Sequence, residues 1–100
     1  AVGFSLMEEI ARDNGNVINP NLADYKLPAA GDLPPMATMF VQTDDPTGPY
    51  GAKSGSEGPM SPLAPAIANA IFDAVGVRIR SLPITAEKVL NALKEKGLAS

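Results

Sequence analysis

The sequence predicts an α+β fold with about three helices, a few short strands and one long loop rich in glycine and proline. Apolar residues recur with helical spacing in three separate segments, at residues 2–12, 63–75 and 86–93. Short apolar runs bounded by turn residues lie between these segments, which is typical of strands. Residues 44–62 contain four glycines and four prolines, a density that neither a helix nor a strand tolerates.

The first segment predicts a helix over residues 2–12. Leu6 and Ile10 lie one turn apart on its inward face, and the Glu8-Glu9 pair lies outward. The next four residues, Asp13-Asn14-Gly15-Asn16, predict a tight turn because Asn and Gly adopt positive φ at low cost. A turn is therefore expected directly after the first helix.

Residues 17–43 combine a short extended run, an irregular segment and a strand. The extended run begins at Val17-Ile18 and ends at Pro20. Residues 19–28 show no period, and we expect them to lie over the surface of something larger. Residues 36–43 are the strongest strand candidate, because Phe40-Val41 at their centre are strand-forming residue types.

The second half predicts two helices joined by a strand. Residues 63–75 are apolar nearly all round, which predicts a buried helix, and Gly76 suits its C-terminal cap. Apolar and polar residues alternate in part over residues 77–82, which indicates a short strand. Thr85 is a natural N-cap for the last helix, which we expect to end at Gly97.

Composition excludes several classes of function. A net charge of −3 without a basic stripe argues against nucleic acid as a partner. The absence of Cys excludes iron–sulfur ligands, and the absence of His excludes a Ser-His triad and an ordinary zinc site. The longest apolar stretch, residues 63–75, is too short to cross a bilayer and contains Asn69 and Asp73, so no membrane role is expected.

The 44–62 loop is the segment best suited to chemistry. It is not a P-loop, because Ala52 and Thr47 occupy two positions where that motif needs glycine. Its glycine-rich backbone can still direct N–H groups at an anion. Glu57, between Ser56 and Gly58, could approach a ligand closely and act as a general base where protein excludes water. A solvated carboxylate in a flexible linker is the ordinary interpretation, and composition leaves both open.

Several motifs together resemble the C-terminal segment of the molybdenum-binding large subunit in the xanthine dehydrogenase/aldehyde oxidase family. The resemblance covers all 100 residues in order. The segments that resemble the family are Gly3–Glu9, Asn19–Tyr25, Gly48–Lys53 with Glu57–Pro59, Pro65–Ile71, and Gly76–Arg80 with Leu82–Thr85. It implies that residues 1–100 are the C-terminal part of a molybdopterin-binding domain, either as a fragment or as a separate small chain.

The loop of that family commonly reads Gly-Ala-Lys-Gly-Val-Gly-Glu. Here Ser54, Gly55 and Ser56 replace its Gly, Val and Gly, while Glu57 is retained. The resemblance implies that Glu57 is the catalytic base and that no protein side chain ligates the molybdenum directly. The residues that it implies as cofactor-binding are Gly51, Ala52, Lys53, Ser54, Gly55 and Ser56.

The resemblance also implies a molybdenum hydroxylase that oxidises an aldehyde or an N-heterocycle with water as the oxygen source. Its cofactor would be molybdopterin, with the cytosine dinucleotide form as one option. The expected partners are the remainder of the molybdenum subunit and the Fe–S and FAD domains or subunits. A cytoplasmic location is expected, with the periplasm as the alternative. Alone, the chain should be inactive, and the competing hypothesis is a non-catalytic docking domain or a remnant of the same fold.

Overall fold

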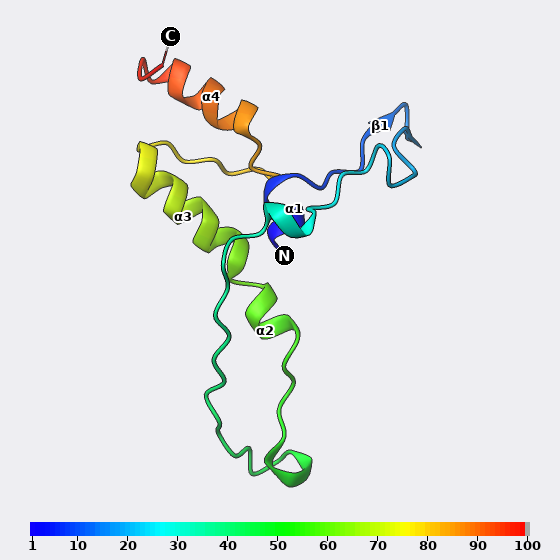
Figure 1. Ribbon diagram of the computed structural model, residues 1–100, viewed down its shortest axis with the longest axis vertical. Coiled ribbons are helices and arrows are strands. Elements are labelled where there is room, and N and C mark those ends of the chain that lie inside the picture. Colours follow the sequence, from blue (N-terminus) through cyan, green and yellow to red (C-terminus); the bar gives the residue numbers. More distant parts are fainter. Residues whose placement is uncertain (100) are drawn as a thin grey trace.

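The computed structural model describes residues 1–99 (Figure 1). Its three longest helices are α1 (Val2–Leu6), α3 (Leu63–Val75) and α4 (Ala86–Glu95). Helix α1 packs against α3 at the centre of the molecule, and α4 lies apart near the C-terminal end. A two-stranded hairpin projects on one side, and a long loop extends away from the helices on another. Helices and strands are therefore segregated along the chain, which confirms the predicted α+β class.

The first helix is shorter than predicted. It ends at Leu6, because Met7 has a φ of −148° and leaves the helical region. The side chain of Asn19 then supplies the hydrogen bonds that a longer helix would have made. Its Nδ2 donates to the carbonyl of Glu9 at 2.7 Å, and its Oδ1 accepts from the N–H of Ala11 at 2.9 Å. A helix over residues 2–12 was therefore wrong beyond Leu6, since a side chain distant in sequence competes for the backbone.

The predicted turn is confirmed as a β-hairpin. Strand β1 (Arg12–Asp13) pairs antiparallel with β2 (Asn16–Val17). The two linking residues have positive φ, 47° at Asn14 and 84° at Gly15, as a type I′ turn requires. The N–H of Ile18 adds one further bond across the hairpin, to the carbonyl of Ala11 at 3.0 Å.

The strongest strand candidate is not a strand. Residues 36–43 follow a short 3-10 turn, η1 (Ala30–Asp32), and lie in no regular element. Their side chains are open to solvent, with 87% of Met39, 91% of Phe40 and 82% of Val41 exposed. A strand needs a neighbour for its backbone, and within residues 1–99 the only paired strands are β1 and β2.

The last two helices follow the prediction closely. Gly76 ends α3 with a φ of 72°, and its N–H donates a hydrogen bond to the carbonyl of Phe72 at 2.8 Å. Thr85 caps α4, where its side chain accepts from the N–H of Lys88 at 3.3 Å. Gly97 has a φ of 69° just beyond the end of α4. Both helices are encoded by local spacing and caps, which explains why sequence reasoning located them.

The sequence predicted that α3 would be buried, but the described residues do not cover it. One stripe of this helix is half-buried, formed by Leu63, Ala64, Ile67, Ala68 and Ile71. It faces α1, which packs against α3. No residue of α3 is fully buried, and Phe72 and Val75 near its C-terminal end are exposed. Within residues 1–99, α3 keeps much of its apolar surface open.

The predicted strand over residues 77–82 is an extended segment without a partner. Its alternation is real: Val77 is buried, Ile79 is half-buried, and the arginines beside them are exposed. Arg78 turns back onto α3, where its Nη1 donates to Oδ1 of Asn69 at 2.7 Å. Its guanidinium also lies 4.4 Å from the centre of the Phe72 ring. The segment is thus held by side-chain contacts with α3 instead of by a strand ladder.

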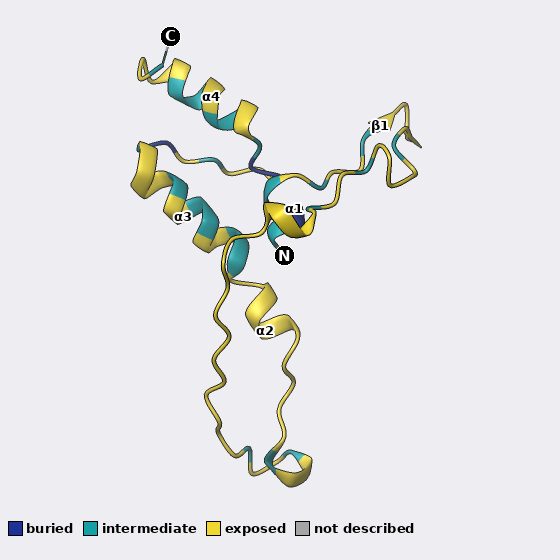
Figure 2. Ribbon diagram, viewed as in Figure 1, coloured by how far each residue is buried: buried dark blue, intermediate teal, exposed yellow. Residues whose placement is uncertain are grey.

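The core is small: most of its residues lie where α1 meets the segment before α4, and Val77 lies just after the end of α3. The buried residues are Gly3, Ser5, Val77, Pro83 and Ile84, shown dark in Figure 2. The N–H of Ile84 donates to the carbonyl of Ser5 at 2.6 Å, which joins these two segments directly. The peptide bond between Leu82 and Pro83 is cis.

The molecule exposes more surface than a globular monomer of its size. Its accessible area is 7923 Å², whereas a folded monomer of this mass exposes about 5,400 Å². Its radius of gyration is 17.9 Å, against about 13 Å for a compact domain of 100 residues. No helix within residues 1–99 is long and apolar enough to cross a membrane.

Candidate active-site loop

The 44–62 loop contains two short helical turns that the sequence did not predict. A 3-10 turn, η2 (Pro49–Gly51), lies at its tip, and a short helix, α2 (Glu57–Met60), lies on its return side. Pro59 falls in the first turn of α2, where the missing N–H of proline costs no helical hydrogen bond. The expectation that neither helix nor strand would form in this loop was therefore wrong, because proline is compatible with a first turn.

The tip of the loop is closed by hydrogen bonds within the chain. The N–H of Asp45 donates to the carbonyl of Gly51 at 3.2 Å, across the base of the turn. The Asp45 carboxylate accepts from the N–H of Thr47 at 2.8 Å and from its hydroxyl at 2.7 Å. These bonds favour the charged form and hold the pKa of Asp45 below its ordinary value. Asp-Pro-Thr spacing is typical of such a turn, and it could have indicated this pairing from the sequence.

At two positions of the tip, the geometry of the chain requires glycine. A Cβ built on Gly48 would overlap the carbonyl oxygen of Ala52. Gly51 has a φ of 77°, a conformation that side chains rarely adopt. Tyr50, between them, also has positive φ and is fully exposed. The tip is thus a tight turn whose geometry does not depend on any other molecule.

The segment from Lys53 to Ser56 differs from the tip. All four residues are exposed, and none of their N–H groups donates a hydrogen bond to another residue of the 1–99 range. A Cβ on Gly55 would meet nothing within 4 Å, so this chain places no steric demand for glycine there. The segment presents a row of free backbone donors to its surroundings.

Glu57 begins α2 directly after this segment. Its carbonyl accepts from both the N–H and the hydroxyl of Ser61, each at 3.0 Å, which orients the first turn. Its carboxylate is exposed and makes no hydrogen bond or ion pair within residues 1–99. The implied site residues Gly51 to Ser56 therefore lie contiguous with Glu57 on one side of the loop, and the described residues do not enclose them.

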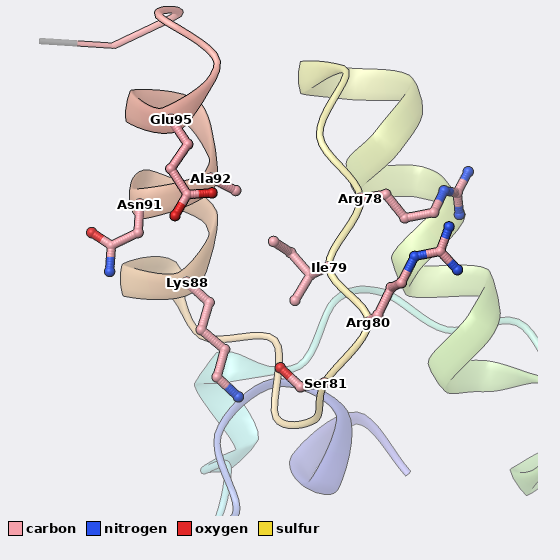
Figure 3. A pocket seen from close by; sticks show the side chains of 8 residues that line it. All are labelled: Arg78, Ile79, Arg80, Ser81, Lys88, Asn91, Ala92 and Glu95. Atoms are coloured by element: carbon pink, nitrogen blue, oxygen red, sulfur yellow. The ribbon is translucent and has the colours of Figure 1, made fainter.

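A shallow groove lies elsewhere, between α4 and residues 78–81. Its volume is about 310 Å³, and Figure 3 shows its lining from Arg78, Ile79, Arg80, Ser81, Lys88, Asn91, Ala92 and Glu95. Both arginines extend toward α3 and away from α4 in this view. Neither Glu57 nor any other residue of the 44–62 loop lines this groove. Within residues 1–99 no cluster of three acidic side chains could hold a metal ion.

Comparison with known proteins identifies the class. No family model matches the chain. Curated relatives at 36–43% identity over nearly its whole length show that the chain corresponds to a segment of xanthine dehydrogenase and aldehyde oxidoreductase molybdenum-binding subunits, as the motifs implied.

Three of these relatives illustrate the match. A xanthine dehydrogenase molybdenum-binding subunit of Escherichia coli O157:H7 is 42% identical over 97% of the chain, which covers 13% of that subunit. An aldehyde oxidoreductase molybdenum-binding subunit of Escherichia coli K12 is 37% identical over 94% of the chain and 13% of its own length. A nicotinate dehydrogenase subunit of Pseudomonas putida is 37% identical over 92% of the chain and 7% of its own length. The chain therefore spans about an eighth of the subunits it matches first.

Proposed function

We propose that this chain supplies the catalytic base and part of the cofactor cradle of a molybdenum hydroxylase. The assembled enzyme would oxidise an aldehyde or an N-heterocycle and take the oxygen from water. Relatives named for xanthine, aldehyde and nicotinate oxidation support this reaction class. Because the chain matches only an eighth of such subunits, the substrate pocket and most cofactor contacts would come from the remainder of the subunit.

One observation carries the proposal. An exposed carboxylate, Glu57, follows four residues whose backbone N–H groups are all without partners in the described chain. Because these groups have no partner in the described chain, they are available to hydrogen-bond an anionic group that lies along the loop.

Molybdopterin fits this donor set, because its dithiolene and phosphate groups are anionic. Lys53 to Ser56 would hold it through their backbone N–H groups, with the Lys53 ammonium as an additional positive charge. Gly51 and Ala52, whose N–H groups donate to the carbonyls of Gly48 and Pro49, would flank the group at the turn. When bound, the group would supply a Lewis-acidic, redox-active molybdenum that takes up two electrons from the substrate. No side chain of this chain is needed as a metal ligand in this arrangement.

Glu57 would move the proton. Its carboxylate oxygens would accept a proton from the water-derived oxygen that enters the product, and would release it to solvent after the reaction. Enclosure by the remainder of the subunit would strengthen the carboxylate as a base, because a water-poor environment disfavours its charged form. The short helix α2 positions this residue through the two hydrogen bonds from Ser61.

Electrons would leave through centres held elsewhere. The chain has no Cys, so it holds none of the thiolate ligands of an iron–sulfur cluster. Fe–S and FAD domains or subunits are therefore the proposed partners, and the cytosine dinucleotide form of the pterin and a cytoplasmic location are part of the same proposal.

Replacement of Glu57 by Gln in the assembled enzyme tests the base role. We expect turnover to fall by about 10²–10⁴-fold, the usual contribution of a general base, with molybdenum content unchanged. Glu87→Gln, an exposed glutamate in α4, is the matched control and should keep full activity. Turnover by the Glu57→Gln enzyme equal to that of the unmodified enzyme would contradict the proposal.

A docking or structural role is the second candidate, and the large exposed surface favours it. The two candidates differ in the metal content of the assembled protein. Finding neither molybdenum nor turnover there would favour docking alone. The isolated chain is expected to be inactive in both cases, and metal analysis of that chain would check this.

A further inference from the structure

Residues 33–43 form an extended segment, here called the arm, that combines exposed apolar side chains with a backbone that has no hydrogen-bond partner. All of its large apolar side chains are exposed, and these are Leu33, Met36, Met39, Phe40 and Val41. They follow one another with little interruption, so several apolar side chains are open to solvent together. An exposed apolar surface of this kind marks an interaction site.

The backbone of the arm is also without partners. From Leu33 to Asp44, no N–H or carbonyl group makes a hydrogen bond to any residue in the 1–99 range. If the apolar side chains are buried, these backbone groups leave water with them. A buried N–H or carbonyl without a partner costs free energy comparable to a lost hydrogen bond. Burial of the arm therefore requires a second backbone beside it.

We propose that residues 36–43 add as a β-strand to a sheet in the remainder of the molybdenum-binding subunit. A strand ladder pairs every backbone group of an extended segment, which a helix packed beside it cannot do. The run from Met36 to Val41 is nearly continuous in apolar and β-forming residues, with Thr38 its one polar member, as is typical of a strand covered on both faces. We therefore assign it an interior position, with a neighbouring strand on each edge.

The surface of the chain and its length identify this partner. The chain exposes 7923 Å², roughly 2,500 Å² more than a compact monomer of its mass. That excess falls within the range of an obligate interface, about 2,000–5,000 Å². The relatives are some eight times longer than the chain, so a body large enough to cover the arm belongs to the same subunit. The inference rests on the proposed function in this one respect, that such a subunit assembles.

The arm also bears on the position of Glu57. Figure 1 shows that the arm and residues 52–57 are the two sides of one long loop, joined through the closed tip. Fixing the arm in a sheet would anchor one side of this loop. The other side, which carries the free N–H groups and Glu57, would then be held relative to the same sheet.

Hydrogen exchange measured by mass spectrometry tests the strand. In the isolated chain the amides of residues 36–43 should exchange at the rate of an unstructured peptide. In the assembled subunit we expect them to slow by at least about a hundredfold, as in a paired strand. Equal exchange in both states would overturn the proposal. Protection that arises in the isolated chain and increases with its concentration would assign the arm to a second copy of this chain, and would overturn the stated partner.

A pair of substitutions distinguishes backbone pairing from side-chain burial alone. Val41→Ala and Val41→Pro both remove the valine side chain, but only proline also removes the N–H. We expect residues 36–43 of the assembled subunit to remain protected with Ala and to lose protection with Pro. Equal protection in the two variants would show that no ladder is present at this position and would overturn the interior strand.

The Glu57→Gln enzyme separates this inference from the proposed function. It should lose turnover and keep the protection of residues 36–43. If residues 36–43 were fully protected in the Glu57→Gln enzyme and its turnover were unchanged, the base role would be refuted and the strand would stand. If the Glu57→Gln enzyme lost turnover but residues 36–43 were unprotected in the unmodified subunit, the base role would stand and the strand would be refuted.

Discussion

The hydroxyl of Tyr25 donates a 2.7 Å hydrogen bond to Oε2 of Glu8. This bond joins the N-terminal segment to the irregular segment that follows the hairpin, across 17 positions of sequence. Gly3 makes room for it, because a Cβ at that position would overlap Oε1 of Glu8. The outward position expected for Glu8 on a long helix was therefore wrong, since the helix ends at Leu6 and the carboxylate returns to the fold.

Replacing Glu8 by Gln should lower the pKa of Tyr25 toward the ordinary tyrosine value of about 10. The hydrogen bond to Glu8 is the main cause that raises this pKa, followed by burial and by the negative charge of Glu8. A raised pKa in the folded state means that the bond stabilises the fold below the unfolded pKa and is lost as pH rises through the folded one. NMR titration of the Tyr25 ring measures the shift. An identical titration in the Glu8→Gln chain would contradict this assignment.

Gly3→Ala should displace the Glu8 carboxylate and break the same bond. Because the Cβ meets the flexible end of a side chain first, we expect the loss of stability to stay within about 1–3 kcal/mol. The pKa of Tyr25 should fall as it does in Glu8→Gln. Gly31→Ala is the matched control, since a Cβ there meets nothing within 4 Å. If Gly3→Ala left the Tyr25 titration unchanged, the close approach of Glu8 would be refuted.

Thr47→Ala should raise the pKa of Asp45, although not fully to the ordinary value. The N–H of residue 47 is the larger cause of the lowered pKa and is retained, whereas the hydroxyl bond is lost. A lowered pKa stabilises the folded tip above the unfolded pKa, about 3.9, and this stabilisation disappears as pH falls through the folded value. Carboxyl-carbon NMR of Asp45 measures it. Thr47→Ser keeps a hydroxyl and should titrate like the original chain, and the same rise in both variants would argue against the hydroxyl bond.

Thr85→Ala should destabilise α4 by about 1 kcal/mol, the usual effect of removing an N-cap side chain. The lost interaction is the bond from the Lys88 N–H to the threonine side chain. Thermal unfolding followed by circular dichroism measures the change. Thr85→Ser should retain most of the stability. A melting curve of Thr85→Ala that matches the original chain would show that the cap contributes nothing.

Ser56→Gly should leave stability within a few tenths of a kcal/mol and change the KM of the assembled enzyme. Ser56 stands before α2, but its side chain makes no capping bond. Its hydroxyl and Cβ are therefore free to affect a group that approaches the backbone. Ser81→Gly, at an exposed serine in the segment before α4, is the control outside the loop and should leave KM unchanged. An unchanged KM would show that Ser56 does not face the bound substrate or cofactor.

Local sequence was sufficient for α3, α4 and the hairpin. Their determinants are side chains within a few residues of each other: i, i+4 apolar spacing, the Thr85 cap, the glycine termini and the Asn14-Gly15 turn. The motifs around Glu57 were also sufficient to identify the family. The sequence could not show that Glu57 lies in a helical turn, because the four residues of α2 are too few for any periodicity.

The sequence by itself determined the two later helices, their ends, the tight hairpin and the family of the chain. Only the tertiary structure decided where α1 ends, what Glu8 contacts and whether the segment around Phe40 and Val41 is a strand. The physical reason is the range of the interactions. Helices and turns bond within themselves, whereas a strand takes its hydrogen bonds from a second segment. Asn19 supplied such bonds to residues 9–11, and no described segment supplied them to the arm.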